Sequence, residues 1–192
     1  MKKSLFSLLF LFAWVTSFAQ TDKGSWLLGG TATIGTSSYS FSGSSTTTTT
    51  GITLQPTVGY FIINNLVIGA GVPLSYSSET NTSSSTIGLV PFGRYFFLEG
   101  NVKPFVQAQV GYTSTNITTN VSGRDVSYTS SGSTFGVGGG LAIFLTKSAS
   151  LDLNLYYSST TKNAPSNNAV TGTASNFGLQ VGFLVYLSKG DK

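Results

Sequence analysis

The side chains that most often carry catalysis are scarce in this sequence. Histidine and cysteine are both absent, so the usual general base of Ser-His-Asp sites, the commonest metal ligand and any thiolate ligand are missing. The six acidic residues are Asp22, Glu79, Glu99, Asp125, Asp152 and Asp191. Only Asp152 is predicted to face a closed interior, which does not support a carboxylate pair for hydrolysis. The sequence therefore predicts no catalytic residue, no metal site and no cofactor.

Three consecutive glycines, Gly138-Gly139-Gly140, invite comparison with a phosphate-binding loop. Such loops continue into a helix and carry Lys followed by Ser or Thr, and neither feature follows here. Close packing inside a narrow structure explains the three glycines better.

Arg94 and Asp152 are the only charged residues that we expect inside the fold. A buried charge without a partner would cost several kcal/mol. The two residues are therefore predicted to pair across the interior. The alternative places either residue near a rim, in contact with water.

The N-terminus has the features of a secretory signal peptide. Two lysines precede an apolar run at residues 5–15, and Ser17-Phe18-Ala19 supplies the small residues that a signal peptidase requires. The apolar run is too short to span a bilayer as a helix. The alternative to cleavage is an uncleaved anchor.

We place the cleavage after Ala19, so that the signal peptide spans residues 1–19 and the mature domain residues 20–192. Loss of Lys2 and Lys3 lowers the formal charge from +4 to +2. The remaining basic residues lie far apart, so they form no basic patch that could bind nucleic acid.

Only 8% of the residues are charged, fewer than soluble surfaces usually carry. The apolar content of 40%, with 14 Phe and 9 Tyr, favours an ordered structure over a disordered Ser/Thr-rich chain.

Apolar residues alternate with small or polar ones along several segments, which is the pattern of β-strands. In the clearest segment, residues 176–187, every second residue from Phe177 to Leu187 is apolar. The same pattern recurs in segments 26–34, 52–60, 66–76, 86–97, 106–112, 134–145 and 151–158. No segment after the signal peptide approaches the ~20 consecutive apolar residues of a membrane helix, so any membrane span must consist of strands.

Segment 86–97 is the least regular, because apolar residues occupy both of its faces. We take Arg94 as inward and allow for a β-bulge in this segment. Pro56 and Pro91 also fall inside predicted strands, where each removes a hydrogen-bond donor.

The connections between the predicted strands alternate between short and long. Short connections lie at residues 63–65, 98–101 and 146–149, and long polar ones near 43–50, 77–85, 114–131 and 159–173. Short turns on the periplasmic side and longer loops outside are the arrangement of bacterial outer-membrane barrels.

Eight strands close into a barrel that is just wide enough to be filled by side chains. The Gly, Ser, Thr, Gln and Asn face is therefore predicted to fill the middle, and the Leu, Val, Ile and Phe face to contact lipid, with no backbone edge left unpaired. Two aromatic girdles are predicted, formed by Trp26, Tyr60, Tyr95 and Phe97 near the short turns and by Tyr76, Tyr112, Phe135 and Tyr157 toward the long loops. The predicted fold is all-β: an eight-stranded antiparallel up-and-down transmembrane β-barrel.

The last strand carries a pattern like that of a barrel-assembly signal. Gln180, Gly182, Val185 and Leu187 match polar-x-Gly-x-x-apolar-x-apolar, although the chain continues through residues 188–192 instead of ending on an aromatic residue. The mature chain resembles the small outer-membrane β-barrels of the OmpA and OmpX type. This resemblance implies a monomer in the outer membrane of a Gram-negative bacterium, inserted by the barrel-assembly machinery and in contact with outer-membrane lipid and lipopolysaccharide.

Two functions are compatible with this fold. The first is a structural or surface-interaction barrel with a filled interior, no open pore and no catalysis, which the low interior charge favours. The second is a narrow channel for small or apolar solutes, because many inward residues are small. A secreted lipocalin-like carrier would instead turn its apolar face inward, and an enzyme lacks a supporting set of residues. Conductance across a planar bilayer would separate the first two functions.

Overall fold

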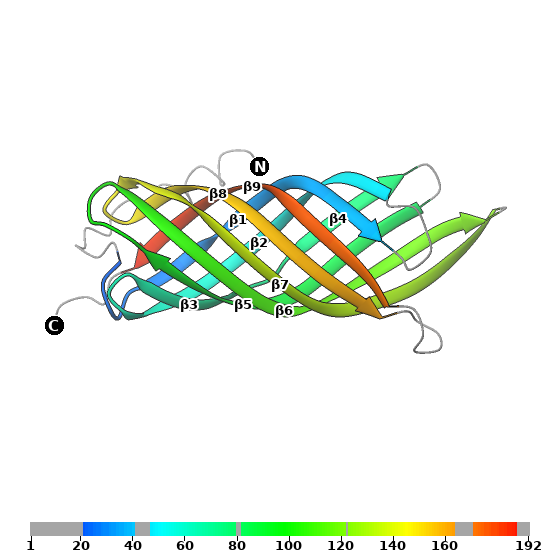
Figure 1. The fold of residues 1–192 in the computed structure, drawn as a ribbon, viewed down its shortest axis with the longest axis horizontal. Coiled ribbons are helices and arrows are strands. Elements are labelled where there is room, and N and C mark those ends of the chain that lie inside the picture. Colours follow the sequence, from blue (N-terminus) through cyan, green and yellow to red (C-terminus); the bar gives the residue numbers. More distant parts are fainter. Residues whose placement is uncertain (1–20, 41–46, 80–81, 122, 164–170, 188–192) are drawn as a thin grey trace, which may run out of the picture.

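The computed structural model describes residues 21–40, 47–79, 82–121, 123–163 and 171–187. In these residues the chain forms nine strands: β1 (Trp26–Ser40), β2 (Thr47–Ile63), β3 (Leu66–Gly71), β4 (Leu74–Glu79), β5 (Thr82–Phe96), β6 (Val102–Val121), β7 (Arg124–Thr146), β8 (Ala149–Asn163) and β9 (Thr171–Leu187). All pairings are antiparallel, and β1 pairs with both β2 and β9, which closes the sheet into a ring (Figure 1). No helix in the described part of the chain is long and apolar enough to cross a membrane. The predicted signal peptide and the tail at residues 188–192 lie outside the described residues.

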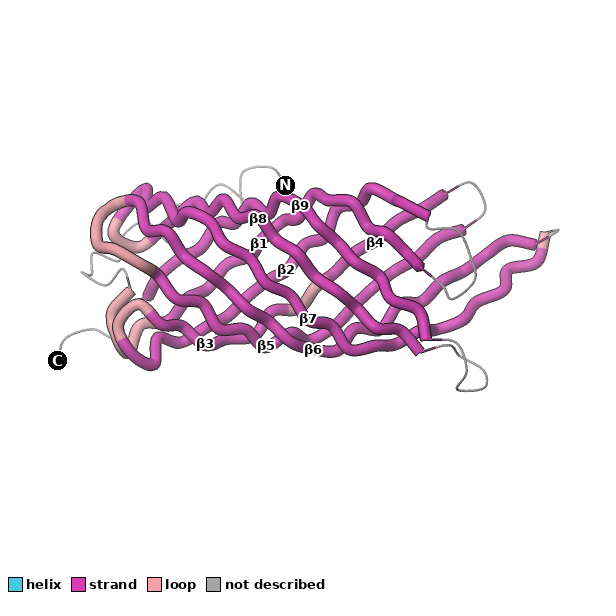
Figure 2. The backbone as a smooth tube through the Cα atoms, in the orientation of Figure 1, coloured by secondary structure: helices cyan, strands magenta, loops and turns pink. Residues whose placement is uncertain are grey.

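Strands β3 and β4 both lie between β2 and β5 and together form one crossing, that is, one pass of the chain along the length of the barrel wall. Only Val72 and Pro73 separate them, and both halves keep one register toward β2 and toward β5 (Figure 2). The Val72 N–H donates to the Pro56 carbonyl at 2.9 Å, whereas Pro73 has no N–H to donate. The barrel therefore has eight crossings, which confirms the predicted fold class.

Segment 86–97 lies in a regular strand, so the β-bulge expected there is wrong. β5 keeps one register with β6 from Thr82 to Phe96. Register shifts occur instead beside two short turns, between Phe61 and Ile63 and between Phe144 and Thr146. The segment is apolar on both faces because Val90, Phe92 and Phe96 are buried inside the barrel while Ile87, Leu89, Pro91 and Tyr95 are exposed.

Pro56 and Pro91 do lie within β2 and β5, as predicted. The interruption of the sheet falls at Pro73 instead, a position that the sequence pattern did not single out.

The Ser- and Thr-rich stretches predicted as long loops are mostly strand where the structure describes them. Residues 114–121 and 124–131 belong to the β6–β7 ladder, which runs to Val121↔Arg124. Hydroxyl groups bond across this ladder, for example Thr118 with Ser127 at 2.9 Å. Thr favours strands, and cross-strand hydroxyl pairs stabilise them. The loops predicted at this end are therefore longer than those in the structure.

Tight turns join the crossings at the opposite end of the barrel, where Figure 2 shows the loops gathered. Asn65 and Leu98 take positive φ angles of 65° and 62°, and Gly100 takes 118°. Asn and Gly tolerate this left-handed conformation, so they suit tight turns. The N-terminal segment packs here too, since the Asn65 N–H donates to the Thr21 carbonyl at 2.8 Å.

The apolar face of every crossing lies on the outside of the barrel. Large exposed side chains include Ile34, Leu54, Ile68, Leu89, Val110, Val137, Leu155 and Leu179. The residues assigned to the two girdles are also exposed: Trp26, Tyr60, Tyr95 and Phe97 at the short-turn end, and Tyr76, Tyr112, Phe135 and Tyr157 toward the other end. The predicted outward direction of the apolar face is confirmed.

Candidate functional site

The barrel interior has three layers, and the layer nearest the short turns is apolar. This aromatic plug consists of Leu27, Phe61, Val67, Phe92, Phe96, Phe105, Ala142, Phe144, Leu184 and Tyr186. The ring centroids of Phe96 and Phe105 lie 5.7 Å apart and those of Phe144 and Tyr186 5.0 Å apart. The expectation that small and polar residues alone fill the middle is therefore wrong at this end. Burying these side chains against one another stabilises the barrel as a soluble core would.

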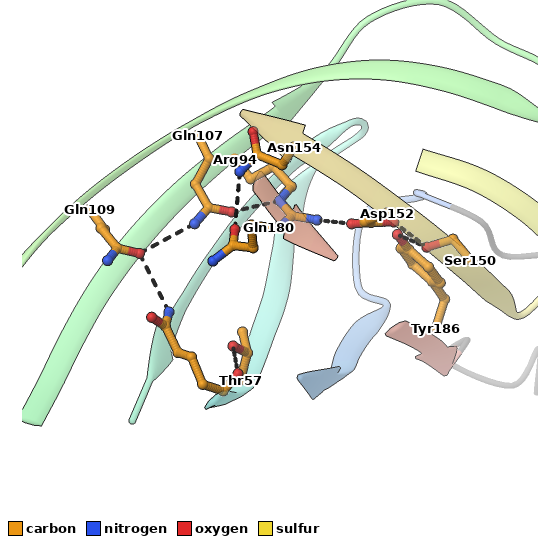
Figure 3. Close-up of polar contacts among 10 residues, drawn as sticks. Thr57, Arg94, Gln107, Gln109, Ser150, Asp152, Asn154, Gln180 and Tyr186 are labelled. Carbon is orange, nitrogen blue, oxygen red and sulfur yellow. Dashed lines mark hydrogen bonds and ion pairs between the residues drawn. The ribbon is translucent and has the colours of Figure 1, made fainter. Parts of the chain in front are cut away.

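Above the plug, Arg94 of β5 and Asp152 of β8 meet inside the barrel (Figure 3). Arg94 Nη1 lies 2.5 Å from Asp152 Oδ2, and the two residues are only 3% and 1% exposed. The structure thus brings together the two charges predicted to pair, and neither lies at a rim in water.

Further contacts surround the ion pair. Arg94 Nε donates to Gln107 Oε1 at 2.8 Å, and the Ser150 hydroxyl donates to Asp152 Oδ1 at 2.7 Å. The Arg94 guanidinium carbon lies 4.2 Å from the centroid of the Phe105 ring. Charge-assisted hydrogen bonds and the aromatic face offset the loss of hydration of the two charges.

Amide side chains extend this polar network across the lumen. Gln107 Nε2 donates to Gln109 Oε1 at 3.3 Å, and Gln109 Nε2 donates to the Tyr156 hydroxyl at 2.5 Å. On the other wall, Asn154 Nδ2 donates to Gln180 Oε1 at 3.0 Å. We call this layer the polar belt; it consists of Gln55, Arg94, Gln107, Gln109, Ser150, Asp152, Asn154, Tyr156 and Gln180.

Beyond the polar belt, the interior opens into a chamber of about 190 Å³. Half of its lining residues are Ser or Thr: Thr33, Thr53, Ser75, Ser77, Ser84, Thr86, Thr113, Thr115, Thr134, Ser158 and Thr160. Gln55, Gln109 and Tyr156 of the polar belt also line it. We call this space the hydroxyl chamber. None of its described lining residues carries a charge.

The chemistry of these layers is that of packing and hydrogen bonding. In the described part of the chain no group of three or more His, Cys, Asp or Glu residues could hold a metal ion. Both carboxylate oxygens of Asp152 accept bonds from neighbours, one from Arg94 and one from Ser150. The arrangement gives no positive support for catalysis.

A comparison with protein families matches residues 5–183 of this chain to the family described as outer membrane protein beta-barrel domain. The chain belongs to this family. No curated protein matches the sequence.

Several solved outer-membrane barrels share the fold of this family member. Neisserial surface protein A is 18% identical with a TM-score of 0.58, over 85% of this chain and 97% of that one. OprG from Pseudomonas aeruginosa is 14% identical with a TM-score of 0.52, over 87% and 97%. Outer membrane protein AlkL, determined in DMPC lipid bilayers, is 13% identical with a TM-score of 0.51, over 93% and 97%. At these identities the likeness shows the fold alone.

This outer-membrane barrel holds a third buried charge that sequence reasoning missed. Lys103, at the start of β6, is 4% exposed, and its Nζ donates to the Thr21 hydroxyl at 2.8 Å. The same Nζ lies 5.6 Å from the centroid of the Phe144 ring. The prediction that Arg94 and Asp152 are the only charges inside is therefore wrong. Lys103 and Gln107 are four residues apart on one strand, so their side chains lie on the same face. This alternation could have identified Lys103 as inward from the sequence.

The residues of the predicted assembly pattern occupy two faces of β9. Gln180 and Gly182 are buried, and Gln180 Nε2 donates to the Thr33 hydroxyl at 3.1 Å. Val185 and Leu187 are half-buried on the outward side. The inward pair thus has a packing role in the barrel wall, while recognition by the assembly machinery stays a prediction.

The glycines of β7 have a packing role as well. A Cβ atom added to Gly140 would overlap the carbonyl oxygen of Leu153 on β8. Close approach of the two strands therefore explains why glycine occupies this position.

Proposed function

We propose that this chain is an integral barrel of the Gram-negative outer membrane, exported by its signal peptide, with a structural or surface-interaction role and no catalytic activity. The observation that carries the proposal is the filled lumen. The aromatic plug and the polar belt together occupy the barrel from the short-turn end to the floor of the hydroxyl chamber. A pore along the axis would have to displace both layers.

The packing of the two layers supports a sealed axis. Phe61 and Phe96 are fully buried, with ring centroids 6.0 Å apart, and Tyr186 lies 6.1 Å from Phe61. The Tyr186 hydroxyl lies 3.1 Å from that of Ser150, which links the plug to the polar belt. Interiors packed in this way leave few voids larger than a water molecule.

The projecting part of the barrel supports a surface role. The β6–β7 hairpin extends beyond the other strands at the end opposite the tight turns (Figure 1). Described pairing of β7 with β8 ends at Gly132↔Lys162, whereas pairing of β7 with β6 continues to Val121↔Arg124. Val126 and Tyr128 are exposed in this part. A strand edge beside exposed apolar side chains suits contacts with an extended partner segment.

The remaining expectations belong to this proposal. We expect outer-membrane lipid and lipopolysaccharide around the apolar wall, insertion by the barrel-assembly machinery, and a monomer. The exposed apolar face and its two aromatic girdles support the lipid contacts. The low interior charge and the absence of histidine support a role without catalysis.

Conductance across a planar bilayer tests the sealed axis. We expect reconstituted protein to show no discrete current steps, because the plug and belt block the lumen. Heat-modifiable gel mobility should verify that the reconstituted protein is folded, and a porin should serve as the positive control. Reproducible single-channel steps from folded protein would favour the narrow channel instead.

A further inference from the structure

The barrel wall opens along one seam between β2 and β4. These strands pair only at Thr53↔Ser75 and Leu54↔Leu74. β2 nevertheless continues to Thr47 in full pairing with β1, and β4 continues to Glu79 in full pairing with β5. The facing edges of β2 and β4 beyond Ser75 therefore lack a pairing in the described structure. The seam follows the interruption at Pro73, where β3 and β4 meet.

Two hollows meet at this seam. Inside lies the hydroxyl chamber of about 190 Å³. Outside lies a groove of about 710 Å³, which we call the outer groove. Ile52, Ser75, Tyr76 and Thr86 line both hollows. The chamber and the outer wall of the barrel are thus neighbours across the seam, without the intact ladder that separates inside from outside elsewhere.

The outer groove is amphipathic. Its apolar wall consists of Ile52, Leu54, Leu74, Tyr76 and Ile87, and its polar wall of Ser85, Ser114, Asn116 and Thr129. Tyr76 is 69% exposed and Ile52 59% exposed at the seam. Tyr76 also belongs to the girdle toward the long loops, where the headgroups of the outer leaflet meet the hydrocarbon.

The lining of the hydroxyl chamber favours a ligand group without charge. Its described lining combines hydroxyls and amides with apolar side chains such as Val90 and Phe177 and includes no charged side chain, so a buried ionic group would lack a counter-charge at a cost of several kcal/mol. Arg94 and Asp152, in the polar belt, already pair with each other. The volume of the chamber corresponds to several water molecules at about 30 Å³ each, enough for a small polar head and too little for a bulky one.

We propose that the seam between β2 and β4 is a lateral portal through which the hydroxyl chamber takes up the head of a neutral single-chain amphiphile from the outer leaflet. The hydroxyl or ester head binds among the chamber hydroxyls. The acyl or alkyl chain passes Ile52 and Tyr76 into the outer groove and the bilayer. Because the polar belt closes the floor, this portal differs from an axial channel and stands whether or not the barrel has a surface role.

Photolabelling with 1-monolauroylglycerol tests the portal in vesicles containing the full barrel. One probe carries a diazirine on the glycerol and a second on the last carbon of the chain. We expect the glycerol probe to label chamber residues such as Thr33 and Thr113, and the chain probe to label Ile52 and Leu74 in the outer groove. Labelling of the outer wall alone by both probes would show an annular lipid only and would overturn the proposal.

Two substitutions of one type complete the test. Thr86→Phe fills the shared mouth, and we expect it to reduce chamber labelling by the glycerol probe at least tenfold. Val110→Phe, on the outward face of β6 away from the seam, should leave labelling unchanged. If Thr86→Phe lacks the heat-modifiable shift of a folded barrel, Ser75→Phe provides the same blockade. Unchanged labelling in a folded mouth variant would contradict the portal.

Competition with unlabelled amphiphiles tests separately whether the chamber prefers an uncharged head. Excess unlabelled monolauroylglycerol should compete with the glycerol probe at least tenfold better than dodecyl phosphate or dodecylamine. Equal competition by either charged amphiphile would overturn the assignment of a neutral head.

Discussion

Asp152→Asn is expected to lower the free energy of unfolding by about 3–5 kcal/mol, because it leaves the Arg94 guanidinium buried without its counter-charge. Arg94→Met should cause a loss of the same order, since Asp152 then stays as an unpaired carboxylate. Both side chains are almost fully buried and in direct contact. Urea titration of the barrel in lipid vesicles, followed by heat-modifiable gel mobility, measures the loss.

The double variant Arg94→Met/Asp152→Asn distinguishes a coupled pair from two independent sites. It removes both charges, so its loss should be no larger than that of either single variant. Asp125→Asn is the matched control, because Asp125 is exposed and an Asn oxygen can still accept the bond from the Asn120 amide, so this neutralisation should change stability by less than about 0.5 kcal/mol. Losses that add in the double variant would mean that the two charges do not stabilise each other.

Phe96→Ala is expected to lower the free energy of unfolding by about 3–5 kcal/mol, because it leaves a cavity in the aromatic plug. Phe96 is 0% exposed and contacts the rings of Phe61, Phe105 and Tyr186. The same urea titration in vesicles measures this variant.

Phe97→Ala is the matched control, one residue along the chain. Phe97 is 41% exposed on the outer wall, and its main aromatic contact is the Tyr95 ring at 5.1 Å. Loss of one aromatic pair at a lipid-facing site should cost about 1.5 kcal/mol. A loss for Phe97→Ala equal to or greater than that for Phe96→Ala would show that the plug does not hold the barrel together.

Much of the barrel could be predicted from the sequence because alternation with period two is a direct result of strand geometry. In β9, residues 176–187 alternate without interruption, so both faces could be assigned. Arg94 and Asp152 could also be placed together, because a charge on an inward face needs a partner. Both predictions required only local patterns and one rule about buried charge.

The remaining features depend on contacts between distant strands. Phe92 and Phe96 share the inward side of β5 with Arg94, but the sequence does not show that their rings pack with those of β2, β6 and β9 into the aromatic plug. Ser and Thr occur in solvated loops and in strands alike, so the β6–β7 hairpin resembled a loop. The seam beyond Ser75 depends on how β2 and β4 diverge, which no local pattern encodes.

The central claim is that the apolar side of each strand faces lipid while the other side is enclosed. Because the chain has no cysteine, single cysteines can be introduced along residues 177–184 of β9 and spin-labelled in bilayers. Oxygen concentrates in the hydrocarbon, so its collisions with the label report contact with lipid. We predict high oxygen accessibility at 177, 179, 181 and 183 and low accessibility at 178, 180, 182 and 184. Uniform accessibility or the reverse alternation would contradict the account.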